Sequence, residues 1–385
     1  MTLPDASAPP AAYQFTDSSV TRPLLTRVWF TRLFPLLPRR LAANLVSLLA
    51  CGSLLTVLAL SLAPGGWSET AIALVFFAAL QIYVAGDHLD GMQALASGTA
   101  SPLGDFVDHY CDLWAGCILV FGFWSLLGTA PPIALYAMMV VLIAAFATTY
   151  AEREADGRLH FTAWGALEAN MILALFLLSW AVPAVRGWWR SPSPLGVPWY
   201  AFAAGVVVAM ALGAVVIIGR RMRRLPAPLV IAVTGLIALA TLVTRRQELR
   251  PVEGWLLLGL FGGRYVARVM HGYLVPARRS WPDPTATVVV LALAIWDLSA
   301  GLPASAVRNG AAVLGAYLAV TLAVTLTRIF AQQRRYWVWM NGPVDGASAK
   351  AASAGDAGTE SASRNTPRHP SRLTPAGEAD PSAGP

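Results

Sequence analysis

The sequence has few charged residues and little cysteine. Of its 385 residues only 13% are charged, whereas a soluble domain carries about 25%. Three cysteines, Cys51, Cys111 and Cys117, lie in or beside apolar runs without paired spacing, which gives neither a disulfide framework nor a zinc motif. The first 20 residues are polar and rich in Pro and Ala, without the apolar stretch of a cleavable signal peptide. Most of the chain is therefore expected to lie in lipid.

Apolar sequence is what the chain has in abundance, since 56% of its residues are hydrophobic. A helix needs roughly 18–20 predominantly apolar residues to cross a bilayer. Ten apolar segments reach or approach this length, at about 44–63, 69–86, 104–128, 131–150, 163–183, 198–219, 227–244, 252–275, 284–300 and 310–330. The sequence therefore predicts an all-α, polytopic membrane protein with about ten transmembrane helices.

The segment before the first span has a different pattern. Within residues 23–37 the apolar residues recur at helical spacing, and Arg27 and Arg32 share the opposite face. This pattern is typical of an amphipathic helix in the membrane interface, and Pro35 and Pro38 would end it. The predicted organisation is a flexible tail at 1–20, an interfacial helix at 21–40, a transmembrane domain at 41–335 and a disordered tail at 336–385.

The net charge of +7 bears on topology. Basic loops mark the cytoplasmic side of a membrane protein, so we favour this explanation over a nucleic-acid partner. Arginines cluster before the first predicted span and after the sixth, eighth and tenth, which places them on one side. Arg245, Arg246 and Arg250 fall on the other side and count against this topology. The balance predicts cytoplasmic termini.

Acidic residues are scarce, 21 in the chain, yet five lie between positions 87 and 112. Asp87 and Asp90 are spaced i,i+3 and Asp108 and Asp112 i,i+4, so each pair shares one face of a helix. Two neighbouring antiparallel helices would bring the four carboxylates together. Carboxylates at membrane depth need a compensating cation or a polar cavity, and oxygen-only ligands favour Mg²⁺ or Mn²⁺. The alternative is a set of helix-end residues solvated at the headgroup level.

The spacing of these residues resembles a known signature. Residues 87–112 read D-H-L-D-G-M-Q-A-L-A-S-G-T-A-S-P-L-G-D-F-V-D-H-Y-C-D. This is similar to the signature of the CDP-alcohol phosphatidyltransferase family, D-x2-D-G-x2-A-R-x8-G-x3-D-x3-D. Every fixed position matches except that Leu95 stands where the family has Arg. Gly91 and Gly104 are two of the matched positions, where glycine lets a backbone or ligand approach closely, although each is equally explained as a loop or packing glycine.

The resemblance implies a membrane enzyme with two divalent cations. In the family the four aspartates, here Asp87, Asp90, Asp108 and Asp112, hold two metal ions that bind the CDP pyrophosphate, as two-metal catalysis of an in-line displacement requires. The family's last aspartate, here Asp112, is often assigned as the base toward the acceptor hydroxyl. The resemblance also implies a homodimer. Leu95 puts one contact of the family in doubt and leaves the metal ligands intact.

Several residues resemble the choline/ethanolamine phosphotransferase branch. The stretch from Ser101 to His109 is similar to that branch's S-P-L-G-E-x-x-D-H, and His109 could deprotonate a lipid hydroxyl or hydrogen-bond a carboxylate. Glu152 and Glu168 fit a W-E-x-x-x-T-G-x-L segment followed by N-G-P-x-E-G, although the Trp, Thr, Asn and Pro are missing. Because Glu168 lies in an apolar run, we expect a substrate-pocket or paired role for it.

Two further candidates have competing explanations. Asn44 stands where the family has P-N-x-x-T ahead of the first helix, and it could equally cap that helix. Arg268 lies with Arg264 and His271 at helical spacing on the expected cytoplasmic half of the eighth span. Arg268 could reach a nucleotide phosphate, but snorkelling to lipid headgroups explains it better.

Three functions are consistent with these features. The leading hypothesis is a catalytic domain at 41–335 that transfers a phospho-alcohol, such as phosphoethanolamine or phosphocholine, from a CDP-alcohol to diacylglycerol or a similar lipid, releasing CMP. The alternative within the family uses CDP-diacylglycerol as donor and a small alcohol as acceptor. A third hypothesis is a transporter or pseudoenzyme without chemistry. For the enzyme we expect the inner membrane of a bacterium.

Overall fold

The computed structural model describes residues 15–246, 248–274 and 280–334, which are almost entirely helical. Two short strands are β1 (Phe15–Asp17) and β2 (Leu159–Phe161). The helices are α1 (Arg22–Leu25), η1 (Thr26–Phe30), α2 (Thr31–Leu33), η2 (Phe34–Leu36), α3 (Ala43–Ser53), α4 (Leu55–Leu62), α5 (Glu69–Ser97), α6 (Pro102–Leu127), α7 (Pro132–Asp156), α8 (Ala166–Ala181), α9 (Pro183–Arg190), α10 (Tyr200–Arg221), α11 (Ala227–Arg245), α12 (Pro251–Leu274), α13 (Pro284–Ala300) and α14 (Ala304–Gln333).

The fold confirms a polytopic, all-α membrane protein, but the count of ten spans is not confirmed. Each of the ten predicted segments overlaps a helix within the described ranges. Within the described ranges, seven helical units are long and apolar enough to cross a membrane, namely α3 with α4, α5, α6, α7, α10, α11 and α14. The bent pair α8 and α9, with 112° between its helices, would make an eighth. The charged side chains of α12 and the 17 residues of α13 keep these two helices outside that set.

The N-terminal segment is helical but irregular. Between Arg22 and Leu36 the chain changes from α-helix to a π-helical turn at Thr26–Phe30, back to α-helix and then to a 3-10 turn. Pro35 lies in that last turn, and the chain is extended at Leu37. The uniform amphipathic helix predicted from the sequence is therefore not confirmed, and its position at the membrane interface stays a prediction.

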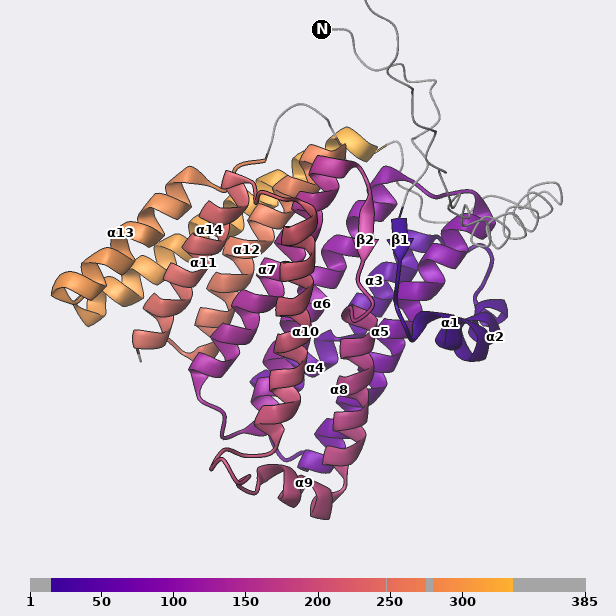
Figure 1. Ribbon diagram of the computed structural model, residues 1–385, viewed down its shortest axis with the longest axis horizontal. Coiled ribbons are helices and arrows are strands. Elements are labelled where there is room, and N and C mark those ends of the chain that lie inside the picture. Colours follow the sequence, from indigo (N-terminus) through magenta and orange to yellow (C-terminus); the bar gives the residue numbers. More distant parts are fainter. Residues whose placement is uncertain (1–14, 247, 275–279, 335–385) are drawn as a thin grey trace, which may run out of the picture. The chain divides into compact units, whose positions relative to one another are not determined.

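The helices pack in two groups that share a central layer (Figure 1). Helices α3, α5 and α8 lie on one side and α11, α13 and α14 on the other, with α6 and α7 between them. Helix α12 joins the groups because it packs against α7, α14, α6 and α11. Its Leu258, Val266, Ala267 and Val269 are fully buried. This charged helix is therefore enclosed by neighbouring helices, which shield it from lipid.

A close contact between α3 and α5 sets the position of the acidic segment. A Cβ atom added at Gly86 would lie 2.5 Å from the Cβ of Ala50, a separation that van der Waals radii do not allow. Glycine is therefore required at this crossing. The crossing is one residue before Asp87, so it places the acidic end of α5 against α3.

Replacing Gly86 by alanine is expected to destabilise the protein by about 1–3 kcal/mol, because the helices must separate to accept the methyl group. Unfolding in SDS, followed by circular dichroism, measures this. Gly91→Ala, five residues further along α5, is the matched control, since no atom lies within 4 Å of its added Cβ. Equal losses in the two variants would contradict the close-contact explanation.

Candidate active site

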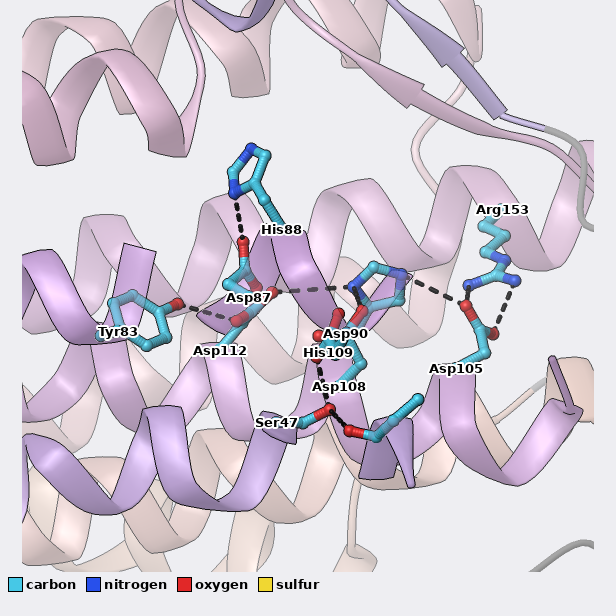
Figure 2. A network of polar contacts seen from close by, with 11 residues as sticks. Ser47, Tyr83, Asp87, His88, Asp90, Asp105, Asp108, His109, Asp112 and Arg153 are labelled. Carbon is cyan, nitrogen blue, oxygen red and sulfur yellow. Dashed lines mark hydrogen bonds and ion pairs between the residues drawn. The ribbon is translucent and has the colours of Figure 1, made fainter. Parts of the chain in front are cut away.

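The helix ends near the acidic segment are defined by local sequence. Helix α5 stops at Gly98, whose φ of 65° is left-handed and suits glycine. Helix α6 starts at Pro102 after the N-cap Ser101, whose Oγ accepts a hydrogen bond of 3.1 Å from the amide of Gly104. This short turn makes α5 and α6 neighbours, so the signature aspartates meet. Figure 2 shows the carboxyl groups of Asp87, Asp90, Asp108 and Asp112 converging between the helices; we call these four the aspartate site.

Asp87 and Asp90 are held from two sides. Asp90 is 4% exposed, and its Oδ2 accepts a hydrogen bond from the hydroxyl of Ser47 on α3. Asp87 Oδ2 lies 3.3 Å from Nδ1 of His88. The His88 ring stacks on Phe30 with 4.3 Å between ring centroids. The N-terminal helical segment and α3 therefore both support the acidic end of α5.

Asp108 and Asp112 surround a histidine. The hydroxyl of Tyr83 donates a hydrogen bond of 2.7 Å to Asp112 Oδ1. His109 Nδ1 lies 3.7 Å from both Asp108 Oδ2 and Asp112 Oδ2. One possible ligand atom from each of Asp108, His109 and Asp112 lies within 4.8 Å of the other two. This arrangement suits a metal ion at the aspartates with the imidazole beside it.

A buried arginine pairs with the fifth acid of the segment. Arg153 on α7 is 2% exposed, and its Nη1 and Nη2 donate hydrogen bonds of 3.2 and 2.7 Å to the two oxygens of Asp105. Asp105 Oδ1 also lies 3.2 Å from His109 Nε2. A bidentate guanidinium–carboxylate pair fixes the plane of the carboxylate. Arg153 therefore fixes Asp105, and Asp105 in turn orients the Nε2 side of the His109 ring, which faces away from Asp108 and Asp112.

The four carboxylates of the aspartate site lack such a partner. Across residues 15–246, 248–274 and 280–334 no arginine or lysine forms an ion pair with any of them. Four carboxylates repel one another strongly in a medium of low dielectric constant. Hard divalent cations prefer carboxylate oxygens, so the residues present fit such an ion.

Two residues matched to the family motifs are in contact, Asn44 near the start of α3 and Gly104 near the start of α6. A Cβ atom added at Gly104 would lie 3.0 Å from Asn44 Oδ1, so the glycine makes room for the buried Asn44 side chain.

Gly91 faces open space, and no atom lies within 4 Å of an added Cβ. Leu95, one turn further along α5, is 72% exposed. The position at which the family has arginine is therefore accessible on the same face as Gly91.

The structure places the remaining candidates outside the network of Figure 2. Both carboxylate oxygens of buried Glu152 accept hydrogen bonds from Arg221, at 2.6 Å from Nε and 2.8 Å from Nη2. Glu168 Oε1 accepts from the hydroxyls of Ser19 and Thr21 at 2.6 and 3.0 Å. Arg268 is on α12. Glu168 is thus hydrogen-bonded to the N-terminal segment, and its substrate-pocket role stays a prediction.

The Glu168 contact also accounts for order near the N-terminus. Residues 15–17, within the stretch for which the sequence suggests a flexible tail, form β1 and pair in parallel with β2. Glu168 Oε1 accepts a third hydrogen bond, from the amide of Thr21, and Oε2 accepts one of 2.8 Å from the amide of Gly165. One carboxylate therefore caps α8 and fixes the chain that follows β1.

Sequence reasoning missed several residues that support the site. Ser47 and Tyr83 are polar groups in apolar runs, which is the signal that could have found them. Arg153 follows Glu152 just after the predicted span 131–150, where a buried arginine requires a partner. Gln93 lies between matched positions of the signature, and its side-chain amide donates to the carbonyls of Pro38, Arg39 and Leu41, at 3.2, 3.1 and 2.8 Å. These contacts hold the loop before α3 against α5.

Comparison with known proteins agrees with the signature. Residues 40–211 match the sequence model of the family described as CDP-alcohol phosphatidyltransferase. Ethanolaminephosphotransferase 1 of Mus musculus is 27% identical over 128 residues, which are 32% of this chain and 31% of the mouse protein. The human protein of the same name is 25% identical over 128 residues, with the same shares. A class-I family protein of Schizosaccharomyces pombe is 31% identical over 110 residues, covering 26% of this chain and 28% of that protein.

The chain matches about a third of the length of these curated relatives. All four members of the aspartate site, together with Asn44, lie within the matched range 40–211. The signature, the convergence of its aspartates and the family match thus describe the same part of the molecule. Residues 40–211 of this chain are thus similar to the CDP-alcohol phosphatidyltransferase family.

Proposed function

We propose that the protein transfers a phospho-alcohol group from a CDP-alcohol to a lipid hydroxyl and releases CMP. One observation carries the proposal, namely the four converging carboxylates at the junction of α5 and α6, which have no arginine or lysine partner among the described residues and lie beside His109. A site with this charge suits a divalent cation and a pyrophosphate substrate. Such chemistry belongs to the family whose model matches residues 40–211.

The aspartate site would hold two divalent cations, Mg²⁺ or Mn²⁺. When bound, these cations neutralise the pyrophosphate and stabilise the departing CMP. Ser47 restrains Asp90 and Tyr83 restrains Asp112, so two of the four carboxylates keep their direction through hydrogen bonds from neighbouring helices. Outer hydrogen bonds of this kind orient metal ligands and tune their affinity.

His109 is the better placed of the two candidate bases. If its Nε2 carries the proton that Asp105 accepts, Nδ1 is the unprotonated nitrogen and lies on the side of Asp108 and Asp112. The lipid hydroxyl would give its proton to Nδ1 as its oxygen attacks the β-phosphorus, and the bond to the CMP oxygen breaks. Asp112 is the alternative base, but it already accepts a hydrogen bond from Tyr83.

The proposed donor is CDP-ethanolamine or CDP-choline and the proposed acceptor is diacylglycerol. Support comes from the relatives, because the mouse and human proteins are named ethanolaminephosphotransferases. Two residues that resemble the choline/ethanolamine phosphotransferase branch also support this donor. Ser101 caps the start of α6, and His109 is the candidate base. We also propose a homodimer in the inner membrane of a bacterium with both termini cytoplasmic, a topology that the arginine clusters support.

An assay of purified protein in vesicles tests the function. Radiolabelled CDP-ethanolamine, CDP-choline and CDP-diacylglycerol are each supplied with Mn²⁺ or with EDTA, with diacylglycerol as acceptor for the first two and serine, glycerol 3-phosphate or inositol for the third. We expect release of CMP from a CDP-amino-alcohol only with the metal ion, because the carboxylates alone would repel a pyrophosphate. Turnover of CDP-diacylglycerol instead would identify CDP-diacylglycerol as the donor and a small alcohol as the acceptor. The absence of turnover with all three donors would contradict the proposal.

A further inference from the structure

A second group of charged side chains lies between α12, α13 and α14. Arg264 Nη2 on α12 is 2.5 Å from Asp283 Oδ2 at the start of α13. The hydroxyl of Tyr317 on α14 contacts both oxygens of Asp283, at 3.1 and 3.2 Å, and its ring lies under the guanidinium of Arg264. Three helices that share no residue with the aspartate site thus enclose one ion pair.

The guanidinium of Arg264 is only partly satisfied. Its Nε and Nη1 are buried, and neither has a hydrogen-bond partner in the described structure. Asp283 has little capacity left for them, because its Oδ1 also accepts a hydrogen bond of 2.8 Å from the amide of Ala286. Buried donors without partners are costly. These two unpartnered donors of Arg264 therefore suit an oxygen-rich ligand.

Arg268 increases the positive charge of this group. It follows Arg264 by one helical turn, so both side chains leave the same face of α12. The described residues give the Arg268 side chain no ion pair or hydrogen bond, and Asp283 supplies one negative charge for two guanidinium groups. An excess of positive charge among membrane helices requires a counter-ion. We call Arg264 and Arg268 the arginine site.

The arginine site lies near the same end of the bundle as the aspartate site but on another face of α6. Helices α6 and α12 run antiparallel, since Trp255 Nε1 donates to the carbonyl of Cys117 at 2.9 Å while Gly263 packs against Tyr110 and Trp114. Tyr110 and Trp114 therefore face α12, whereas Asp112 faces Tyr83 of α5. This separation argues against a shared ligand.

We propose that the arginine site binds a phosphate-bearing anion. Either Nε or Nη1 of Arg264 would donate to one of its oxygens, and Arg268 would donate to another from the next turn, as charge-assisted hydrogen bonds. Basic pockets between transmembrane helices bind the head groups of anionic lipids, and free phosphate has the same chemistry. Under this proposal the phosphate that Arg268 contacts is not the pyrophosphate at the aspartate site.

Binding to the purified full chain in neutral detergent tests the proposal. Thermal unfolding is followed during titration with phosphatidylglycerol, with inorganic phosphate and with diacylglycerol, which lacks a phosphate. We expect phosphatidylglycerol to stabilise the chain and diacylglycerol to have no such effect. Arg268→Gln should weaken the binding about 10-fold or more, because one charge-assisted hydrogen bond is lost. Stabilisation by inorganic phosphate with the same dependence on Arg268 would identify free phosphate as the ligand.

Two further variants complete the test. Arg308→Gln removes an exposed arginine near the start of α14 and should bind like the wild type. Arg264→Gln with Asp283→Asn removes both charges of the ion pair at constant shape, so it should keep the fold and lose the binding. The proposal is overturned if Arg268→Gln binds as tightly as the wild type, or if Arg308→Gln weakens binding equally.

Discussion

Replacement of Asp108 by alanine is expected to abolish metal-dependent CMP release. Asp108 is on α6, its carboxyl group points toward those of the other three aspartates, and one of its oxygens is 3.7 Å from His109 Nδ1. Loss of an outer-shell partner alone lowers metal affinity or activity about 10–100-fold, so loss of a ligand should cost more than about 100-fold. The measurement is CMP release from CDP-ethanolamine in vesicles over a range of Mn²⁺ concentrations.

The control for Asp108→Ala is Asp156→Ala, which removes an exposed carboxylate at the end of α7. It should retain wild-type activity. Circular dichroism of both variants establishes that the helices are intact. An Asp108→Ala protein that releases CMP at the wild-type rate would refute both the aspartate site and the proposed function.

Replacement of Arg153 by alanine is expected to destabilise the protein by about 3–5 kcal/mol. The guanidinium is 2% exposed and pairs with both oxygens of Asp105, so its removal leaves a carboxylate that is only 14% exposed without its arginine partner. Unfolding in SDS at constant detergent, followed by circular dichroism, gives the change in free energy of unfolding.

The double variant Arg153→Ala with Asp105→Ala separates the ion pair from lost packing. Because it removes both charges, it should recover part of the stability that the single variant loses. If the double variant were less stable than Arg153→Ala alone, Asp105 would not depend on Arg153 for its charge balance. The same comparison in CMP release reports whether Asp105 also orients His109.

The sequence predicts the aspartate site well because the spacing of the residues carries the information. Asp87 with Asp90, and Asp108 with Asp112, must share helix faces once the two segments are helical. The S-P-L-G stretch also encodes its own local structure, since Ser101 caps α6 and Pro102 occupies its first turn. For these residues, local sequence and membrane helicity are enough.

Contacts across long sequence separations could not be predicted in this way. Arg153 lies 48 residues from Asp105, and no pattern along the chain says which buried acid it meets. Arg221 is similarly remote from Glu152. The span count differs for another physical reason. Helices that face lipid must be apolar. Helix α12 is shielded by neighbouring helices and therefore tolerates Arg264 and Arg268.

The Glu168 anchor has a consequence for the order in which the chain assembles during its synthesis. Ser19 and Thr21 leave the ribosome well before Glu168, which follows Ser19 by 149 positions. The N-terminal segment can therefore dock only after α3 to α7 have been made and α8 has entered the bilayer. Phe30, which stacks on His88 beside Asp87, follows this anchored stretch by nine residues. A nascent chain that stops before α8 would therefore lack the anchor at Ser19 and Thr21.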